Sequence, residues 1–383
     1  MSGPRAAVIG GGIGGLAAAT ALAVRGWQVS VYERAPALRA VGGALTLWSN
    51  GVDALDRLGV GAAVRARGAP LERAELRAWD GALLQSLPVG PHARRRGALH
   101  LLVDRGALLE ALAAALPVGA LRCGRGVATV RATDGRAEIA FDDATTTAAD
   151  LAVGADGLHS VVRASLLGAE PPRAADQEAW VGRAPPGVVG PPSGASVGVV
   201  GRGLRFWYAR LADAVHWYAI VSRQSARAAE LRDKAGLAEL FRAWAAPVGP
   251  LIASTPAEAI TRAEIRDRPP AARWSGDVAT LVGDAAHPMT PDLGQGACQA
   301  LEDAVALGRA LAPSEPVRAG LARYERTRRA RADAVAELSR LVARLAMPPS
   351  DAACALRDAT WRVTPAEAFL AQLDLVTSDG AAT

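Results

Sequence analysis

Apolar and polar positions alternate near the start of the chain in a pattern that predicts a strand, a helix and a second strand. The apolar run at residues 6–9 has the length of a buried parallel strand. An alanine-rich helix pattern occupies residues 16–24, and Gly26 stands where a helix C-cap is expected. Residues 27–32 form the next strand pattern, so the segment predicts a β-α-β unit with parallel strands.

Patterns of the same kinds continue along most of the chain. We expect helices within residues 45–58, 100–116, 226–245 and 317–347. We expect strands within residues 69–88, 118–153 (three or four of them), 195–221, 260–271 and 278–282. The pairs Asp80-Gly81 and Asp134-Gly135 are typical of hairpin turns, which makes the strands that flank them antiparallel.

Three glycines follow the first strand pattern in the spacing G-x-G-x-x-G: Gly10, Gly12 and Gly15. The first permits a tight turn, the second lets the backbone approach a pyrophosphate, and the third lets helix and strand pack closely. The phosphates would meet unpaired N–H groups at the helix N-terminus. Glu33 ends the second strand 18 residues after Gly15, where a carboxylate can accept ribose hydroxyls. The unit therefore predicts a dinucleotide site.

Two other interpretations of this segment compete. Arg5 followed by a long apolar run is compatible with a signal peptide or a membrane span, although clustered glycines are unfavourable in such a segment. The glycine spacing alone can also arise by coincidence. Strand, helix, strand and terminal acid all stand in the order that a nucleotide site requires, which favours dinucleotide binding over both.

Composition narrows the class of protein. At 383 residues the chain is long enough for about two domains, and half of its residues are apolar, which argues against disorder. The net charge of +5 comes almost wholly from arginine, because Lys234 is the only lysine. The arginines are interleaved with acids rather than gathered in a stripe, so we expect no nucleic-acid partner.

Three cysteines, Cys123, Cys298 and Cys354, lie far apart and show no spacing typical of metal ligands. We expect no metal site, and we interpret Cys298 as a small packed helix residue rather than a redox group. Widely spaced cysteines fit a reduced, cytoplasmic location. After the first thirty residues no segment is apolar enough to span a bilayer, so we expect no membrane span.

Two further motifs follow buried strand patterns. In the first, an apolar strand runs into the turn Gly-Ala-Asp-Gly at residues 154–157, and a helix pattern begins after it. In the second, the strand pattern at residues 278–282 is followed directly by Gly283-Asp284. A loop at residues 291–296 then leads into another helix pattern.

These motifs, in this order and at these spacings, resemble those of the class A FAD-dependent monooxygenases with the para-hydroxybenzoate hydroxylase-type fold. The resemblance covers nearly the whole chain. The first glycine motif resembles the family's ADP-binding unit, residues 154–157 its DG motif, Gly283-Asp284 its GD motif, and residues 291–296 the P-x-x-G-x-G loop beside the flavin ring. Residues 48–52 and 294–300 are similar to the urate hydroxylase and zeaxanthin epoxidase group.

The resemblance implies an α/β fold in which a Rossmann-like FAD-binding domain carries an inserted antiparallel-sheet substrate domain and C-terminal helices. On this basis we expect the FAD-binding domain at residues 1–70, 101–170 and 271–312. The substrate domain is expected at residues 71–100 and 171–270. C-terminal helices are expected at residues 313–377 and a disordered tail at residues 378–383.

The resemblance also implies which residues hold FAD. A carboxylate at Asp284 can accept a ribityl hydroxyl, and the helix after residue 296 points N–H groups at the flavin pyrimidine edge, whose reduced form is anionic. Asp156 is expected to orient backbone near the pyrophosphate. The full set of expected FAD contacts is Gly10, Gly12, Ile13, Gly14, Gly15, Glu33, Arg34, Gly43, Arg105, Val127, Asp156, Asp284, Pro291, Gly294, Gln295, Gly296 and Ala297.

The activity implied by the resemblance is oxygen insertion. NADPH or NADH reduces FAD, O2 adds at flavin C4a, and the hydroperoxide hydroxylates or epoxidises an aromatic or heteroaromatic small molecule. We expect Arg205, Trp207, His216 and Tyr218 to form the substrate pocket, with Arg205 pairing an anionic or enolic oxygen and His216 assisting deprotonation. Trp217 is a further candidate, but strand alternation places it on the opposite face from His216 and Tyr218.

Several alternatives stay open at this point. The same FAD motifs would serve an oxidase or a reductase without oxygen insertion, and more remotely a non-catalytic FAD-binding protein. His287 is interpreted as a structural hydrogen-bonding residue rather than a base. The sequence leaves the choice between NADH and NADPH open, as it does the choice between a monomer and a homodimer.

Overall fold

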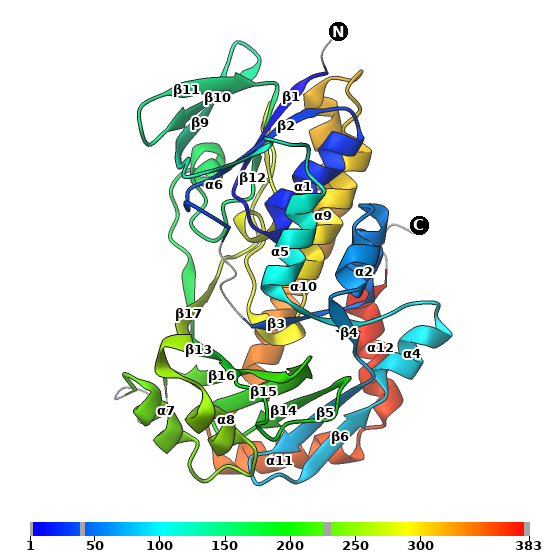
Figure 1. Cartoon of the computed structure of the whole chain (residues 1–383), viewed down its shortest axis with the longest axis vertical. Helices are drawn as coiled ribbons and strands as arrows, with labels where there is room; N and C mark the ends of the chain where they lie inside the picture. The colour runs from blue at the N-terminus through cyan, green and yellow to red at the C-terminus, as the bar shows by residue number, and fades with distance from the viewer. Residues whose placement is uncertain (1–2, 39–42, 225–230, 379–383) are drawn as a thin grey trace.

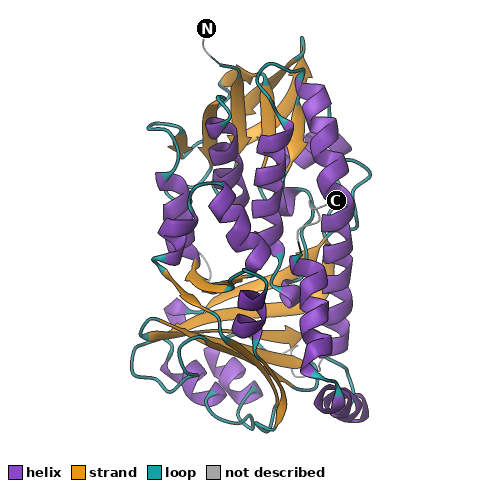
Figure 2. Cartoon of the chain, turned by 90° about the vertical axis from the view of Figure 1, so that its right-hand side faces the viewer, coloured by secondary structure: helices purple, strands orange, loops and turns teal. Residues whose placement is uncertain are grey.

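The computed structural model describes residues 3–38, 43–224 and 231–378. It confirms the α/β class, with a parallel sheet and a larger, mostly antiparallel sheet at opposite ends of an elongated molecule (Figure 1). The long helix α10, Val317–Ala346, runs lengthwise beside both ends (Figure 2). Near its start, Tyr324 donates a hydrogen bond to the carbonyl of Leu281 in the parallel sheet. Just after its end, Met347 packs against Ile220 of the larger sheet.

The described strands of the parallel sheet stand in the order β18-β12-β1-β2-β8, which places β1 at the centre. Val8 of β1 lies beside Val153 on one side and Val31 on the other. All three side chains are fully buried, as expected for a parallel strand with both faces covered. The strands are β1 (Arg5–Ile9), β2 (Gln28–Glu33), β8 (Leu121–Cys123), β12 (Leu151–Gly154) and β18 (Ala279–Leu281).

Helices cover one face of this sheet, and a small antiparallel sheet covers the other (Figure 1). Helix α1, Ile13–Val24, packs on the sheet between α5, Arg105–Ala114, and α9, Gly296–Ala310. The opposite face carries α6, Val161–Leu167, and three strands in the order β11-β10-β9. These strands are β9 (Val127–Thr133), β10 (Arg136–Phe141) and β11 (Thr146–Ala149).

The larger sheet has the order β17-β13-β16-β15-β14-β5-β6 among the described residues, with β14 and β5 parallel and the other neighbours antiparallel. Two segments that are far apart in sequence thus build one sheet. Its strands are β5 (Arg73–Ala78), β6 (Leu83–Leu87), β13 (Arg173–Ala184), β14 (Ala195–Val200), β15 (Leu204–Leu211), β16 (Ala214–Ser222) and β17 (Thr261–Asp267).

Short elements join and cover these layers. A third small sheet, in the order β3-β7-β4, lies between the two ends of the molecule (Figure 1). Its strands are β3 (Ala44–Leu47), β4 (Gly68–Pro70) and β7 (Leu101–Asp104). The other helices are α2 (Ser49–Arg57), α3 (Gly61–Arg65), α4 (Val89–Arg95), α7 (Lys234–Leu240), α8 (Val248–Ser254), α11 (Asp351–Val363) and α12 (Ala366–Thr377), with single turns η2 (Ala257–Ala259), η3 (Gly283–Ala285) and η4 (Pro291–Leu293).

The two faces of strands β15 and β16 have different surroundings. Phe206 and Trp217 stack with ring centroids 5.3 Å apart, and both are buried in a cluster that includes residues of α7 and α8. Trp217 also donates a hydrogen bond to Thr255 at 2.9 Å. The opposite face carries Trp207 and Tyr218, which are cross-strand neighbours. Side chains of β16 thus alternate between the two faces as expected from the sequence, and Trp217 lies on the face that is buried against α7 and α8.

Two expected elements differ from the structure. Within residues 231–245, the described part of the helix expected at residues 226–245, the helix is limited to α7, because the Asp233 side chain caps its start by accepting from the Gly236 N–H. It ends before Phe241, whose ring turns into the core against Trp244. Residues 118–153 contain five strands rather than three or four, since the short edge strand β8 pairs with β2.

Parts of some expected features lie outside the described residues. They are residues 226–230 of the expected helix and residues 379–383 of the expected tail. No helix in the described ranges is long and apolar enough to cross a bilayer.

The buried face of the larger sheet gives a stability prediction. Trp217→Ala should lower the free energy of unfolding by about 3–5 kcal/mol, because it removes a stacked ring and leaves a cavity. Trp79→Ala is the matched control, since Trp79 is 46% exposed and should cost less than about 1 kcal/mol. Urea denaturation followed by circular dichroism measures both. Equal effects of the two substitutions would contradict the assignment of Trp217 to the core.

Candidate functional site

The N-terminus of α1 is shaped by its glycines. Gly10 has a φ of +108°, and a Cβ on it would lie 2.3 Å from the Ala155 carbonyl oxygen. A Cβ on Gly15 would lie 2.0 Å from the carbonyl oxygen of Gly10. In contrast, a Cβ on Gly12 would meet no atom of the described residues within 4 Å. Gly10 and Gly15 are therefore required for packing, whereas Gly12 borders open space in front of the helix.

The carboxylate of Glu33 lies beside this open space at the end of β2. It accepts hydrogen bonds from the backbone N–H groups of Gly11 and Ala35, each at 2.8 Å. These bonds fix the carboxylate at the glycine turn, where the sequence expected it to meet a ribose. Of the other residues expected nearby, Arg34 is exposed, and Gly43 and Val127 are half-buried.

A second helix N-terminus, that of α9, lies close to the first. A Cβ on Gly14 of α1 would lie 3.4 Å from the Ala300 side chain of α9. Gly296, the first residue of α9, again borders open space, since a Cβ there would meet nothing within 4 Å. Neither α1 nor α9 has a side-chain cap, although Asp104 caps α5 and Ser160 caps α6. Their first N–H groups are thus available to an anionic ligand.

The loop at residues 291–296 is held from α2. Gly294 has a left-handed φ of +61° and lies against the indole of Trp48, whose Nε1–H donates to the Leu293 carbonyl at 3.0 Å. Gln295 turns its side chain inward and accepts from Asn50 at 2.9 Å. Any contact of Gln295 with a ligand is therefore left to its backbone. Pro291 is exposed and Ala297 half-buried at the two ends of this stretch.

Asp284 follows β18 and is exposed, although Gly283 and Ala285 on either side are buried. Within the described ranges its carboxylate forms no hydrogen bond, so it can accept hydrogen bonds from hydroxyl groups. The turn that carries Asp284 is held by α9, because the Gly283 N–H donates a hydrogen bond to the carboxylate of Asp303 at 2.9 Å.

Asp303, on α9, is the centre of a buried ionic cluster. Besides Gly283, its carboxylate contacts His287 Nε2 at 2.6 Å and Arg328 Nε at 2.8 Å. Burial by itself would raise the pKa of Asp303, but the positive charges of His287 and Arg328 lower it to about 2. The His287 side chain is 1% exposed. His287 is thus a structural partner of Asp303, as interpreted from the sequence.

The turn at residues 154–157 is held by its own acid. The Asp156 carboxylate accepts from the Ser160 hydroxyl at 2.5 Å and from the Val161 N–H at 2.7 Å, at the start of α6. Burial raises the pKa of Asp156, and these hydrogen bonds oppose that rise. Further along α6, Arg163 donates to the carbonyls of Ala285 and Ala286 at 3.1 and 3.0 Å. Asp156 therefore has a structural role: it holds the turn at residues 154–157 against the start of α6. Through Arg163, α6 also contacts the turn that carries Asp284.

Arg105 is the first residue of α5 and is half-buried. The helix cap is supplied by Asp104, which accepts from the N–H groups of Gly106 and Ala107. Within the described ranges Arg105 forms no ion pair, although a cation at a helix start is not favoured by the helix dipole. An anionic partner from a ligand would satisfy it.

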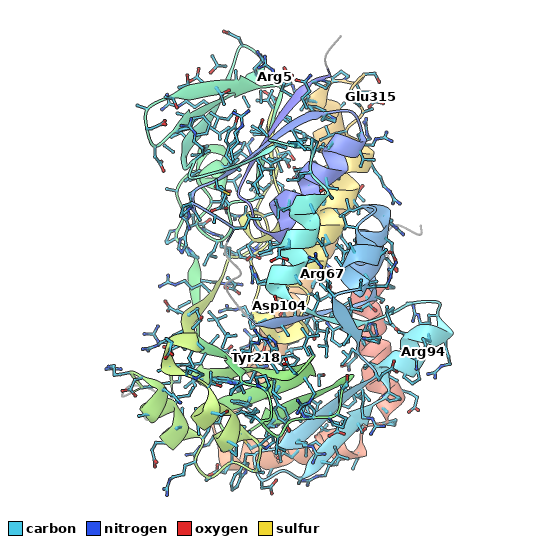
Figure 3. All side chains as sticks on the ribbon, viewed as in Figure 1. Arg5, Arg67, Arg94, Asp104, Tyr218 and Glu315 are labelled. Atoms are coloured by element: carbon cyan, nitrogen blue, oxygen red, sulfur yellow. The ribbon has the colours of Figure 1, made fainter. Side chains whose placement is uncertain are left out.

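The residues expected to bind substrate share one face of the larger sheet. Trp207 and Tyr218, the second of which is labelled on the larger sheet in Figure 3, stack with ring centroids 5.1 Å apart. Arg205, two residues before Trp207, forms an ion pair with Asp292 of the 291–296 loop, with Nη2 and Oδ1 2.6 Å apart. Burial raises the pKa of Tyr218, and the charge of Asp292 raises it further against the opposing effect of Arg205. The Tyr218 hydroxyl therefore keeps its proton at neutral pH.

His216 lies on the same face but is engaged with the backbone. Its Nδ1 accepts the Ala44 N–H of β3 at 3.1 Å, and burial lowers its pKa below the ordinary value of 6.5. A neutral imidazole that accepts at Nδ1 carries its proton on Nε2 and has no lone pair left for a base. This geometry favours a positioning role for His216 over deprotonation of a substrate.

These features together fit FAD. Two uncapped helix N-termini border open space, as the pyrophosphate and the anionic edge of a reduced flavin require. Glu33 and Asp284 present carboxylates to the same region at the ends of β2 and β18. A fold with this strand order and these sites defines a FAD-dependent enzyme of the class A monooxygenase type.

Comparison with known proteins places the chain in a family. Residues 5–339 match the model of the FAD binding domain family, so the chain belongs to it. The aurachin C monooxygenase/isomerase of Stigmatella aurantiaca is 34% identical over 93% of each chain. The FAD-dependent urate hydroxylase of Klebsiella pneumoniae is 33% identical over 85% of each. The solved structure of Klebsiella pneumoniae HpxO with FAD and uric acid has a TM-score of 0.90 at 28% identity, covering 99% of this chain and 98% of that one.

Sequence reasoning missed several residues that hold the site. Asp303 and Arg328 carried no signal beyond being a helix acid and one of many arginines. Asp292 lies inside a recognised loop motif, so a charge between its proline and its two glycines could have drawn attention to it. Trp48 and Asn50 were noticed only as points of resemblance, and their contacts with residues 293 and 295 span about 245 positions.

The ionic cluster gives a prediction for cofactor binding. Asp303→Asn should lower the free energy of unfolding by at least about 3 kcal/mol and weaken FAD binding at least tenfold, because it leaves Arg328 buried without its full counter-charge. Because folding lowers the pKa of Asp303 from 3.8 to about 2, its stabilisation is complete above about pH 4 and is lost as the pH falls toward 2.

Asp277→Asn is the control for this prediction, since Asp277 pairs with Arg318 on the surface at 3.4 Å. Thermal unfolding and the fluorescence of released FAD measure stability and affinity. An Asp303→Asn protein that binds FAD as tightly as the Asp277→Asn protein would show that the cluster does not support the cofactor site.

Proposed function

We propose that this chain is a single-component FAD-dependent monooxygenase that uses NAD(P)H and O2 to hydroxylate or epoxidise an aromatic or heteroaromatic small molecule. The observation that carries the proposal is the ion pair of Arg205 and Asp292, which joins the substrate face of the larger sheet to the loop at residues 291–296. In this assignment residues 71–100 and 171–270 bind substrate, and the segments around them hold FAD.

The ion pair also indicates which chemical groups a substrate would present to Arg205 and Asp292. Within the described ranges, Asp292 Oδ2 and Arg205 Nε have no hydrogen-bond partner although both are buried, whereas Asp292 Oδ1 is occupied by the ion pair with Arg205 Nη2. Buried polar groups without partners are costly, so a substrate that bonds to them gains affinity. Arg205 donates and Asp292 accepts, which suits a ring with a carbonyl next to an N–H or O–H group. A relative named urate hydroxylase and a solved complex with uric acid support a ring substrate of this kind.

Other residues of this face would orient the ring. The stacked pair of Trp207 and Tyr218 offers flat apolar surface, and the protonated Tyr218 hydroxyl can donate a hydrogen bond. His216 fixes β3 against the sheet through Ala44 and so sets the position of Gly43 beside the site.

The protein's part in the reaction is binding, orientation and exclusion of water. When bound, FAD supplies the redox chemistry, accepting hydride from NAD(P)H and delivering one oxygen atom of O2 to the ring. Glu33, Asp284 and the N-terminus of α1 would hold it. The uncapped N-terminus of α9 at Gly296 would stabilise negative charge that develops on the reduced ring.

Isotope labelling tests the proposed activity. FAD-loaded enzyme is mixed with NADPH and a panel of phenols, indoles, purines and hydroxypyridines under ¹⁸O2. We expect one class to speed the bleaching of the flavin bands and to give a product with one ¹⁸O atom. A product without label, or consumption of NADPH that yields only hydrogen peroxide with every compound, would contradict oxygen insertion.

Substitution of Arg205 tests the proposed substrate site. Arg205→Ala should raise the KM for the substrate at least tenfold, because it removes a charge-assisted hydrogen bond worth about 1.5–3 kcal/mol, and should leave FAD content unchanged. Arg210→Ala is the matched control, since Arg210 lies on the same strand and bonds to the carbonyls of Val188 and Pro191 instead. An unchanged KM in the Arg205→Ala enzyme would remove Arg205 from the substrate site.

A further inference from the structure

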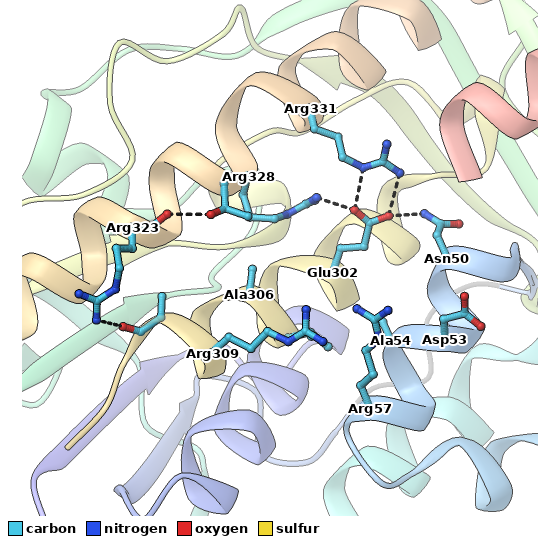
Figure 4. A pocket seen from close by; sticks show the side chains of 13 residues that line it. Asn50, Asp53, Ala54, Arg57, Glu302, Ala306, Arg309, Arg323, Arg328 and Arg331 are labelled. Carbon is cyan, nitrogen blue, oxygen red and sulfur yellow. Dashed lines mark hydrogen bonds and ion pairs between the residues drawn. The ribbon is translucent and has the colours of Figure 1, made fainter. Parts of the chain in front are cut away.

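A cavity of about 260 Å³ lies between helices α2, α9 and α10, apart from the site described above (Figure 4). None of the residues expected to touch FAD or substrate lines it. Part of its wall is apolar and formed by small side chains, those of Ala54, Val305, Ala306 and Ala310. The rest of its wall is dominated by arginine.

Five guanidinium groups line the cavity, against the carboxylates of Asp53 and Glu302. Glu302 is fully engaged, because it bonds to Arg328 and Arg331 at once and also accepts from Asn50 at 2.6 Å. It cannot neutralise further cations. The five arginines come from three helices and are Arg57, Arg309, Arg323, Arg328 and Arg331.

The arginines are held in different ways. Arg328 and Arg331 are fixed by Glu302, and Arg323 pairs with Glu315 outside the cavity lining. Arg309 is exposed and forms no ion pair or hydrogen bond within residues 3–38, 43–224 and 231–378. Arg309 of α9 and Arg57 of α2 point toward one another across the cavity (Figure 4). The positive charge of Arg309 is therefore directed into the cavity without a partner among the described residues, and an anion bound there would pair with it.

We propose that this cavity binds a small, multiply charged anion of the phosphate ester or diphosphate class, independently of the flavin site. Guanidinium groups match phosphate oxygens with paired hydrogen bonds, which favours phosphate over a simple halide. The volume lies below the range of about 300–1,000 Å³ that encloses drug-sized ligands. The cavity thus accommodates a phosphate-bearing group and a small apolar part, and cannot enclose a dinucleotide.

Calorimetric titration with inorganic pyrophosphate tests the proposal on the FAD-loaded enzyme, in which the flavin site is already filled. We expect saturable binding at one site. Arg309→Glu should weaken it at least tenfold, because it reverses the charge that no group of the described residues pairs. Arg362→Glu is the matched control: Arg362 is exposed on α11, and its substitution changes the net charge equally without touching the cavity. It should leave the affinity unchanged.

Competition by NADPH, with NADH as reference, separates two sources of the phosphate. If NADPH competes with pyrophosphate and NADH does not, the cavity binds the 2′-phosphate of the reductant. If NADPH does not compete, the cavity binds a separate small phosphate compound. The melting temperature of the Arg309→Glu protein reports whether its fold is intact. Absence of saturable pyrophosphate binding to the unmodified enzyme, or equal weakening by Arg309→Glu and Arg362→Glu, would overturn the proposal.

Discussion

The rest of the structure depends on the hydrogen bonds and ion pair that the buried carboxylate of Asp303 forms. It bonds at once to the Gly283 N–H, to His287 and to Arg328, so one side chain of α9 fixes α10 and the turn that presents Asp284. Isolated charges are costly to bury, and this one is tolerated because every partner is a donor and Arg328 carries a positive charge. Apolar packing of similar area would hold the helices together, but it would not fix the position of a backbone N–H beside the cofactor. We therefore attribute the precision of the site to this cluster and its stability to the apolar core around it.

The same reasoning explains why glycine recurs where the helices begin. Gly10 and Gly15 are needed because neighbouring backbone lies where their side chains would be, whereas Gly12 and Gly296 face open space. The first pair brings β1, α1 and the 154–157 turn together, and the second pair keeps two uncapped helix ends accessible. Close packing of the backbone around the helix start and open space for a ligand at the same helix end are separate requirements, and the G-x-G-x-x-G motif satisfies both.

Much of the fold could be predicted from the sequence, because its signals are local. The strand at residues 6–9, the glycine turn and Glu33 lie within one stretch of about thirty residues, and the Asp104 cap is adjacent to the helix that it starts. Within residues 231–245 the predicted helix is too long, since the cap at Asp233 and the inward turn of Phe241 depend on the sheet beneath them. The supports of the site were missed for the same reason. Asp303, Arg328 and Asn50 are ordinary helix residues until tertiary packing brings them together.

Few polar contacts connect the substrate face to the cofactor end, and their chemistry bears on how substrate enters. His216 to Ala44 is a bond to backbone that has no reason to change during a reaction. Arg205 and Asp292 form an ion pair in which both groups keep unused hydrogen-bonding capacity. If substrate binds there as proposed, a ring with the complementary groups would add bonds to this pair without first breaking a saturated one, so the cost of entry would be small. A fully satisfied salt bridge at the same place would hold the two ends together more firmly and would exclude the proposed substrate.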